Sequence, residues 1–197
     1  PPREPSMPLI TINPPEVEPV TVEDIKAAAR IDAASFDDQL ADLLIPAMRD
    51  EAQHRLGRRL ITQTVELVGP AFPAGAIDLQ LPDIQSIVSI KYLDPDRIEQ
   101  TVPDTDYTLD SDSRPGLALL APDSEWPATA AVPNAVRVRY TVGYGDAPAD
   151  VPANIRLWII ASVIQALDTP NALAPATLQP LPYLARLLDA EMFVRAV

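Results

Sequence analysis

The spacing of apolar residues changes twice along the chain, and this change constrains the fold more than any other feature. Near both ends, apolar residues recur every three or four positions, as on one face of a helix. Between residues 63 and 150 they form short runs that alternate with polar residues and end at turn residues, as in β-strands. We therefore expect an α+β fold, mainly a helical bundle built from the N- and C-terminal segments with an inserted small antiparallel β module.

Prolines set the first boundary of this arrangement. Residues 1–20 contain seven prolines, which lack a backbone donor and fix φ, so this segment is expected to be an extended arm and neither helix nor central strand. Plain disorder is the alternative for a terminus of this composition. The helical bundle is then expected from residues 21–62 together with 151–197, and the inserted β module from residues 63–150.

Local signals place the helices. Thr21 and Asp24 have the spacing of a capping box, which predicts a helix to about Ile31. Ser35 is expected to cap a second helix that Pro46 should kink or split into two segments. Pro152 is expected to open a third helix. The last helix is expected to run from about residue 181 to residue 192 or beyond.

Alternation places the strands. The cleanest one is Val136–Val142, and Gly143 or Gly145 after it is expected to adopt a positive φ where the chain turns back into the helices. The other expected strands are residues 64–68, 76–81, 84–93, 107–109 and 117–120.

Charge is distributed unevenly and excludes one class of function. The net charge is −13, and residues 63–150 carry fourteen acidic but only five basic residues. Segments 21–62 and 151–197 together carry eleven acidic and nine basic residues. Non-specific DNA binding requires Lys and Arg to neutralise phosphates, so this chain is not expected to hold nucleic acid. With no cysteine, no apolar run of about 20 residues and no signal peptide, the chain is expected to be soluble and intracellular.

Residue types that carry catalysis or bind metal are sparse. The single histidine, His54, has no nucleophile motif to serve and is expected to be a structural or surface residue. The segments 94–96 and 110–113 faintly resemble calcium ligands, but they lack a full calcium-loop pattern and are better explained as turns. We expect no catalytic residue, no cofactor and no metal, and a binding or assembly protein in place of an enzyme.

Three stretches, taken in order, resemble the head–tail connector (adaptor) proteins of long-tailed phages and prophages, in their longer variety with a β insertion. They are residues 22–26, 37–40, 49–52 and 56–61; then 88–94, 107–109 and 126–127; then 136–145, 151–152 and Ile155. The resemblance covers about residues 20–197. The proline-rich arm lies outside it, and Pro46 is unusual in a helix that the family keeps continuous.

The resemblance implies a structural virion protein without catalytic activity. Such proteins form a homo-oligomeric ring, usually twelve-fold, below the portal protein in the neck of the particle, which is assembled in the host cytoplasm. The ring extends the DNA channel, lets DNA pass without specific binding, and offers a platform for the stopper or tail-completion protein. No membrane is involved. The alternative is a small-ligand or carbohydrate-binding β module with helical flanks.

Two sets of residues are candidate contact sites. The near-neutral helical parts are expected to make the contacts between subunits, because acidic β modules packed side by side repel one another unless their charges are paired. Basic residues near the end of the second helix could meet another subunit or partner, although a helix C-terminus also explains them: Arg55, Arg58 and Arg59. Apolar residues of the last segment are expected to dock on the portal, with completion of the subunit's own core as the competing interpretation: Leu184, Leu187, Leu188, Met192, Phe193 and Val194.

Overall fold

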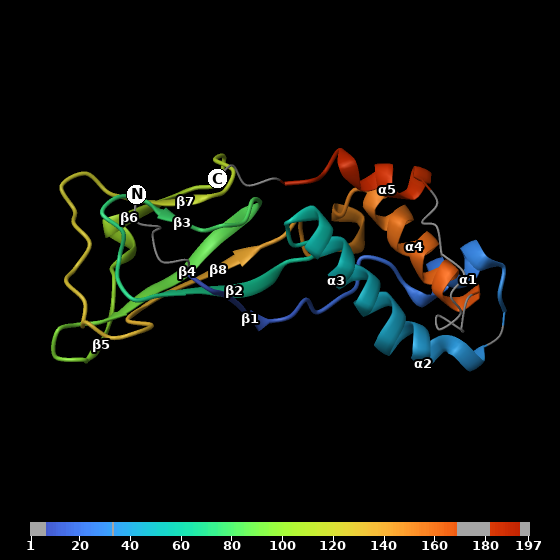
Figure 1. Cartoon of the computed structure of the whole chain (residues 1–197), viewed down its shortest axis with the longest axis horizontal. Coiled ribbons are helices and arrows are strands. Elements are labelled where there is room, and N and C mark those ends of the chain that lie inside the picture. Colours follow the sequence, from blue (N-terminus) through green and yellow to red (C-terminus); the bar gives the residue numbers. More distant parts are fainter. Residues whose placement is uncertain (1–6, 33, 169–181, 194–197) are drawn as a thin grey trace. The chain divides into compact units, whose positions relative to one another are not determined.

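The two kinds of periodicity fold into two separate units (Figure 1). The computed structural model describes residues 7–32, 34–168 and 182–193. Residues 7–15 and 62–143 form one unit, here called the β unit. The described residues between 16 and 61, together with 144–168 and 182–193, form the other, here called the helical unit.

Two antiparallel sheets make up the β unit. The larger sheet has five strands in the order β1-β2-β8-β4-β5, and the smaller has three in the order β3-β7-β6. The strands of the larger sheet are β1 (Leu9–Asn13), β2 (Gln63–Gly69), β8 (Val136–Val142), β4 (Ile84–Leu93) and β5 (Glu99–Thr101). The strands of the smaller sheet are β3 (Ile77–Asp78), β7 (Leu117–Leu120) and β6 (Tyr107–Asp110), which follows a short 3-10 turn, η3 (Asp104–Asp106).

The two sheets share one core. Alternate residues of β8, among them Val138 and Tyr140, point inward and are fully buried with Leu67 of β2 and Ala118 of β7. The Tyr140 hydroxyl donates to the carbonyl of Leu79, so the one polar group of this ring is satisfied inside the core. The smaller sheet therefore covers the inner face of the larger one, and the outer face of the larger sheet carries mainly polar residues, with the exposed Ile10 of β1 among them.

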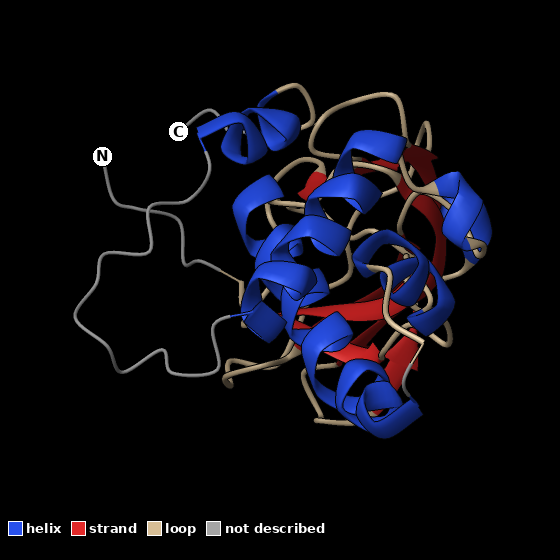
Figure 2. Ribbon diagram, turned by 90° about the vertical axis from the view of Figure 1, so that its right-hand side faces the viewer, coloured by secondary structure: helices blue, strands red, loops and turns tan. Residues whose placement is uncertain are grey.

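Helices pack around a central apolar helix in the helical unit (Figure 2). The central helix is α4 (Ala153–Asp168), whose buried residues Ile155, Ile159 and Val163 contact the helices around it. The surrounding helical elements are α1 (Val22–Ala29), η1 (Ala34–Phe36), α2 (Asp37–Gln39), η2 (Leu40–Leu44), α3 (Ile45–Leu56) and α5 (Pro182–Asp189); a 3-10 turn, η4 (Pro148–Asp150), precedes α4.

The predicted helix starts are right at Thr21 and wrong at Ser35. Thr21 accepts from the Asp24 amide while the Asp24 carboxylate accepts from the Thr21 amide, which is a complete capping box. Ser35 lies inside a 3-10 turn, and α2 begins after Phe36 without a side-chain cap. The interruption expected at Pro46 is a π-helical turn, η2, after which Pro46 occupies the first turn of α3, where its missing N–H costs nothing.

A positive φ occurs at the turn back into the helices, as expected. Gly143 has φ 144°, whereas Gly145 is not among the residues of positive φ. An alanine at 143 is strained in this backbone conformation, so Gly143→Ala is expected to lower the free energy of unfolding by about 1 kcal/mol or more. Chemical denaturation of the two proteins measures this difference, with Gly75→Ala as control because a Cβ at Gly75 meets nothing within 4 Å. Equal effects of the two substitutions would contradict the prediction.

The expectation that the fold is mainly a helical bundle is wrong. The described residues form a mixed structure in which the five-stranded and three-stranded sheets enclose a core comparable with that of the helices. One reason is that strand β1 comes from the proline-rich segment and pairs with β2 at the edge of the sheet, where prolines beside a strand are tolerated. The other is that β5 extends the opposite edge by pairing with β4.

Candidate assembly surfaces

The C-terminal helix α5 is anchored to the subunit's own core through two of the candidate docking residues. Leu188 is 3% exposed and belongs to the core of the helical unit, and Leu187 packs against that core. The Asn154 side chain on α4 donates to the Leu187 carbonyl at 2.8 Å. Both leucines therefore fix α5 on α4. The side chain of Leu184 and the whole of Val194 lie outside the described residues.

The residues after α5 return to the end of α3. The amide of Phe193, which is half-buried, donates to the Leu56 carbonyl at 2.8 Å. Gly57 ends α3 with φ 67°, and a Cβ there would lie 2.8 Å from the Phe193 carbonyl oxygen, so the close approach requires glycine. Met192 is 48% exposed. Of the candidate docking residues whose side chains are described, Met192 is the one that this arrangement presents most openly to solvent.

The side chain of Arg58 also holds the residues that follow α5. Its side chain is 5% exposed and donates through Nη1 to the Tyr144 hydroxyl, which in turn donates to Glu191 Oε2 at 3.2 Å. Arg58 Nη1 lies 3.7 Å from the same carboxylate oxygen, and its guanidinium stacks over the Tyr144 ring at 5.3 Å. The charge of Arg58 is thus used within the subunit.

The other two basic candidates differ in exposure. The Arg55 side chain is 46% exposed, donates to Glu51 at 2.6 Å and lies over the Trp158 ring at 5.3 Å. Arg59 is half-buried. The three arginines are therefore not one patch: Arg58 is buried, whereas Arg55 and the neighbouring His54 are exposed on α3.

A charged triad that was not singled out from the sequence lies on the outer face of the larger sheet. Glu66 on β2 is 6% exposed and accepts from Arg137 at 2.7 Å and from Arg139 at 2.9 Å, both on β8. The two arginine side chains are 46% and 43% exposed. Two guanidinium groups share one carboxylate, so the triad carries one surplus positive charge toward solvent.

The triad fixes the ionisation of Glu66. Burial acts to raise the pKa of this carboxyl, but the hydrogen bonds and charges of Arg137 and Arg139 outweigh burial and hold the pKa below its ordinary range. Because the pKa is depressed in the folded state, the triad stabilises the fold above the pKa of an unfolded glutamate. This contribution is lost as the pH falls through the folded pKa.

A pH series tests that linkage. Glu66→Gln is expected to unfold at a lower temperature than the wild type at neutral pH, and the gap should narrow as the medium is acidified below about pH 4. Thermal unfolding followed by circular dichroism measures the gap. A constant gap between neutral and acidic pH would contradict the linkage. Glu99→Gln is the matched control, because Glu99 pairs with Lys91 at a site where both side chains are about half exposed.

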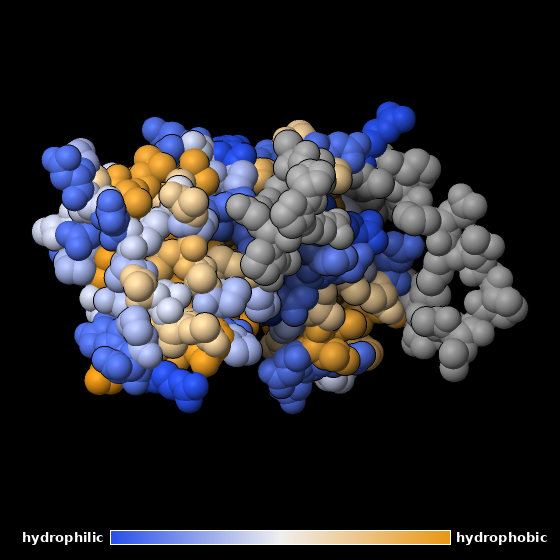
Figure 3. All heavy atoms as spheres, turned by 60° about the vertical axis from the view of Figure 1, so that its left-hand side comes forward, coloured by the Kyte–Doolittle hydropathy of each residue, from blue (hydrophilic) through white to orange (hydrophobic). Residues whose placement is uncertain are grey.

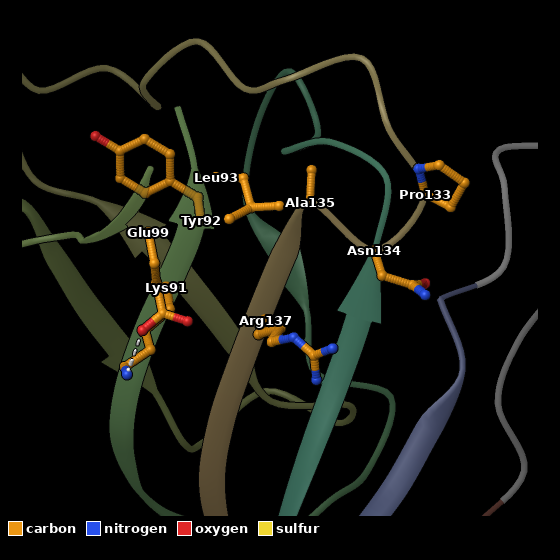
Figure 4. A pocket seen from close by; sticks show the side chains of 8 residues that line it. All are labelled: Lys91, Tyr92, Leu93, Glu99, Pro133, Asn134, Ala135 and Arg137. Atoms are coloured by element: carbon orange, nitrogen blue, oxygen red, sulfur yellow. Dashed lines mark hydrogen bonds and ion pairs between the residues drawn. The ribbon is translucent and has the colours of Figure 1, made fainter. Parts of the chain in front are cut away.

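Beside the triad, a pocket of about 400 Å³ opens at the end of strands β4 and β8 (Figure 4). Lys91, Glu99 and Arg137 line it from three neighbouring strands, with Asn134 and Pro133 from the loop before β8. The Lys91 ammonium donates to Glu99 at 2.8 Å. The pocket wall is open and charged, which suits a polar side chain of a partner.

Two further features concern metals and membranes. Among residues 7–32, 34–168 and 182–193, no group of three or more His, Asp or Glu side chains is placed to hold a metal ion. The aspartates at 94 and 110 accept hydrogen bonds from the amides that follow them, which is turn geometry. None of the described helices is both long and apolar enough to cross a membrane.

Solved structures share this arrangement over nearly the whole chain, although no protein-family model and no curated protein sequence matches it. One is the neck of an empty gene transfer agent (GTA) particle computed with C6 symmetry, with TM-score 0.79, 15% identity, and 97% of this chain and 98% of that chain covered. The chain has the fold of these neck proteins. The resemblance to neck proteins of phage-like particles, expected from the sequence, is thus confirmed at the level of the fold.

Two further structures agree. The virion of a native gene transfer agent particle gives TM-score 0.78 at 16% identity, covering 97% of this chain and 98% of that chain. The neck of a native GTA particle computed with C12 symmetry gives TM-score 0.69 at 16% identity, covering 94% and 97%. Both the β unit and the helical unit are therefore parts of one shared fold.

Proposed function

We propose that this chain is a head–tail connector (adaptor) subunit, a structural virion protein of a particle neck. The observation that carries the proposal is the fold shared end to end with neck chains of gene transfer agent particles. Necks of those particles were computed with C6 and C12 symmetry, which supports a ring of this chain, with twelve copies expected. The ring lies below the portal, extends the DNA channel and carries the stopper or tail; its role is structural and not catalytic. The subunits assemble in the host cytoplasm.

The surface of the helical unit supports its part in subunit contacts. Large apolar side chains are exposed there: Phe36, Leu43, Leu157 and Met192 are 42%, 58%, 51% and 48% exposed. The segments that form this unit are also nearly neutral, whereas residues 63–150 carry most of the negative charge. Helical units can therefore approach one another without the repulsion that acidic surfaces meet.

The overall charge fits a conduit for DNA. At −13, the chain lacks the excess of basic residues that would hold a duplex by its phosphates. An acidic wall keeps the duplex from adhering and lets it slide.

A direct experiment combines the purified chain with portal protein from the same particle and images the mixture by electron microscopy. Rings of the chain seated on the portal are the expected result. A chain that stays monomeric both alone and with portal would overturn the proposal. A ring whose subunit contacts lie wholly within residues 63–150 would overturn the role of the helical unit while leaving the connector function in place.

A further inference from the structure

The outer face of the five-stranded sheet gathers three basic side chains around two carboxylates, Glu66 and Glu99, and so has a surplus of one positive charge, although the unit around it is acidic. Lys91, Arg137 and Arg139 supply three of the five basic residues of segment 63–150, and they are here called the basic face. Lys91 lies directly opposite Arg137 in the β4–β8 register, and Arg139 follows two residues later on the same side of β8. The pairing register of β4 and β8 therefore places these charges side by side.

Arg137 and Arg139 can each accommodate a further hydrogen-bond acceptor. Glu66 fixes one edge of each guanidinium: Arg137 through Nη1, and Arg139 through Nε and Nη2. Among the described residues, neither side chain has another acceptor, and both are almost half exposed. A guanidinium can make several charge-assisted bonds in a fixed plane, so a further carboxylate fits this site geometrically as well as electrostatically.

The layer on the far side of the β unit has the complementary charge. Four acidic residues lie near the end of the smaller sheet and are here called the acidic end: Asp104, Asp106, Asp123 and Glu125. They are near one another because the Ala121 amide, just after β7, donates to the Asp106 carbonyl at 2.9 Å. None of the four has an ion pair among the described residues, and three of them are exposed.

We propose that the basic face of one subunit receives the acidic end of a second copy of this chain. The inference rests on the proposed ring. A closed ring needs a head-to-tail contact between two different surfaces of the same subunit, and these two surfaces lie in opposite layers of one unit. The face of the molecule in Figure 3 shows apolar patches among hydrophilic residues.

The contact also accounts for how acidic β units can stand side by side. Each junction pairs a surplus of positive charge with unpaired carboxylates, so the repulsion expected from the net charge of segment 63–150 is relieved where the subunits meet. The pocket beside Arg137 is lined also by Asn134 and by Lys91, which is paired with Glu99, so Arg137 supplies the positive charge there that an incoming carboxylate can meet.

A charge-swap experiment on the full chain tests this contact. Variant one is Arg137→Glu, which turns the surplus of the triad from one positive to one negative charge. It keeps the bond between Arg139 and Glu66 and places the new carboxylate opposite Lys91. Because it also removes one partner of the buried Glu66, circular dichroism first establishes that the variant is folded. Variant two is Asp104→Lys with Glu125→Lys, both at exposed positions. The control for variant one is Arg97→Glu, which makes the same change in net charge at an exposed residue of the turn between β4 and β5.

Assembly is measured with the portal present, by sedimentation and electron microscopy. Each variant alone is expected to need roughly tenfold more protein than the wild type to form rings, whereas the control assembles normally. The two variants mixed in equal amounts are expected to assemble again. In an alternating ring, every second junction has the wild-type pair of surfaces, and the others place the new carboxylate at position 137 opposite the two new lysines. Rings of either variant at wild-type concentration, or no recovery on mixing two folded variants, would overturn this contact and leave the connector function intact. A wild-type chain that forms no ring overturns the proposed function itself.

Discussion

Replacing Arg58 by alanine is expected to lower the free energy of unfolding by roughly 2–3 kcal/mol and to release the segment after α5 from the end of α3. Arg58 is buried, and its removal leaves the Tyr144 hydroxyl and the Glu191 carboxylate without their common cation. Glu191 is 29% exposed, so water solvates its carboxylate when Arg58 is removed. The loss of stability is therefore smaller than for a fully buried ion pair.

Two measurements check this expectation. Thermal or chemical denaturation gives the loss of stability, and hydrogen exchange of the Phe193 amide, which donates to the Leu56 carbonyl, reports the release of the segment. Arg55→Ala is the control, because that arginine is 46% exposed and its ion pair with Glu51 is expected to contribute about 1 kcal/mol or less. Equal losses for both variants, or a Phe193 amide that stays protected in Arg58→Ala, would show that the network does not hold the segment.

The sequence predicts those elements best whose apolar pattern is strong. Strand Ile84–Leu93 has the bounds predicted for it, and Val136–Val142 also agrees, because alternation along β8 reflects one buried and one polar face. Strand β5 was missed because its three residues, Glu99–Thr101, are polar and exposed, so only pairing with β4 creates the strand. Strand β1 was missed because the prolines around it outweighed the apolar residues Leu9, Ile10 and Ile12 in the interpretation.

The candidate sites are harder to predict, since their partners are distant in sequence. Arg58 meets a tyrosine 86 positions away, and Glu66 meets two arginines 71 and 73 positions away. A local pattern places Arg58 at the end of a helix, where exposure is the ordinary outcome, and only the packed fold shows that it is buried. The spacing of Arg137 and Arg139 does predict a shared face of a strand, but nothing in the sequence identifies Glu66 as the carboxylate between them.

Because Leu187 and Leu188 pack in the subunit's own core, the portal-docking hypothesis now concerns the exposed part of the C-terminal segment, at Met192. Truncation after residue 180 would remove Leu188 from the core as well as any docking surface, so loss of portal binding would not separate the two roles. A point substitution at Met192 separates them, because this side chain is about half exposed while the neighbouring Phe193 amide holds the backbone in place.

Met192→Asp is expected to leave the stability of the subunit within about 0.5 kcal/mol of the wild type and to weaken attachment to the portal at least roughly tenfold. Burying a methionine side chain at an interface contributes about 1.5–3 kcal/mol, and a carboxylate at the same place must be dehydrated without a partner. Ile98→Asp is the control: Ile98 is 59% exposed in the β unit and lies outside the apolar surface of the helical unit, and the change in charge and hydropathy is alike. Affinity for immobilised portal protein should fall for Met192→Asp more than for Ile98→Asp. Unchanged portal affinity in a folded Met192→Asp protein would mean that the exposed end of this segment does not dock, and that α5 and the residues after it serve the subunit's own core.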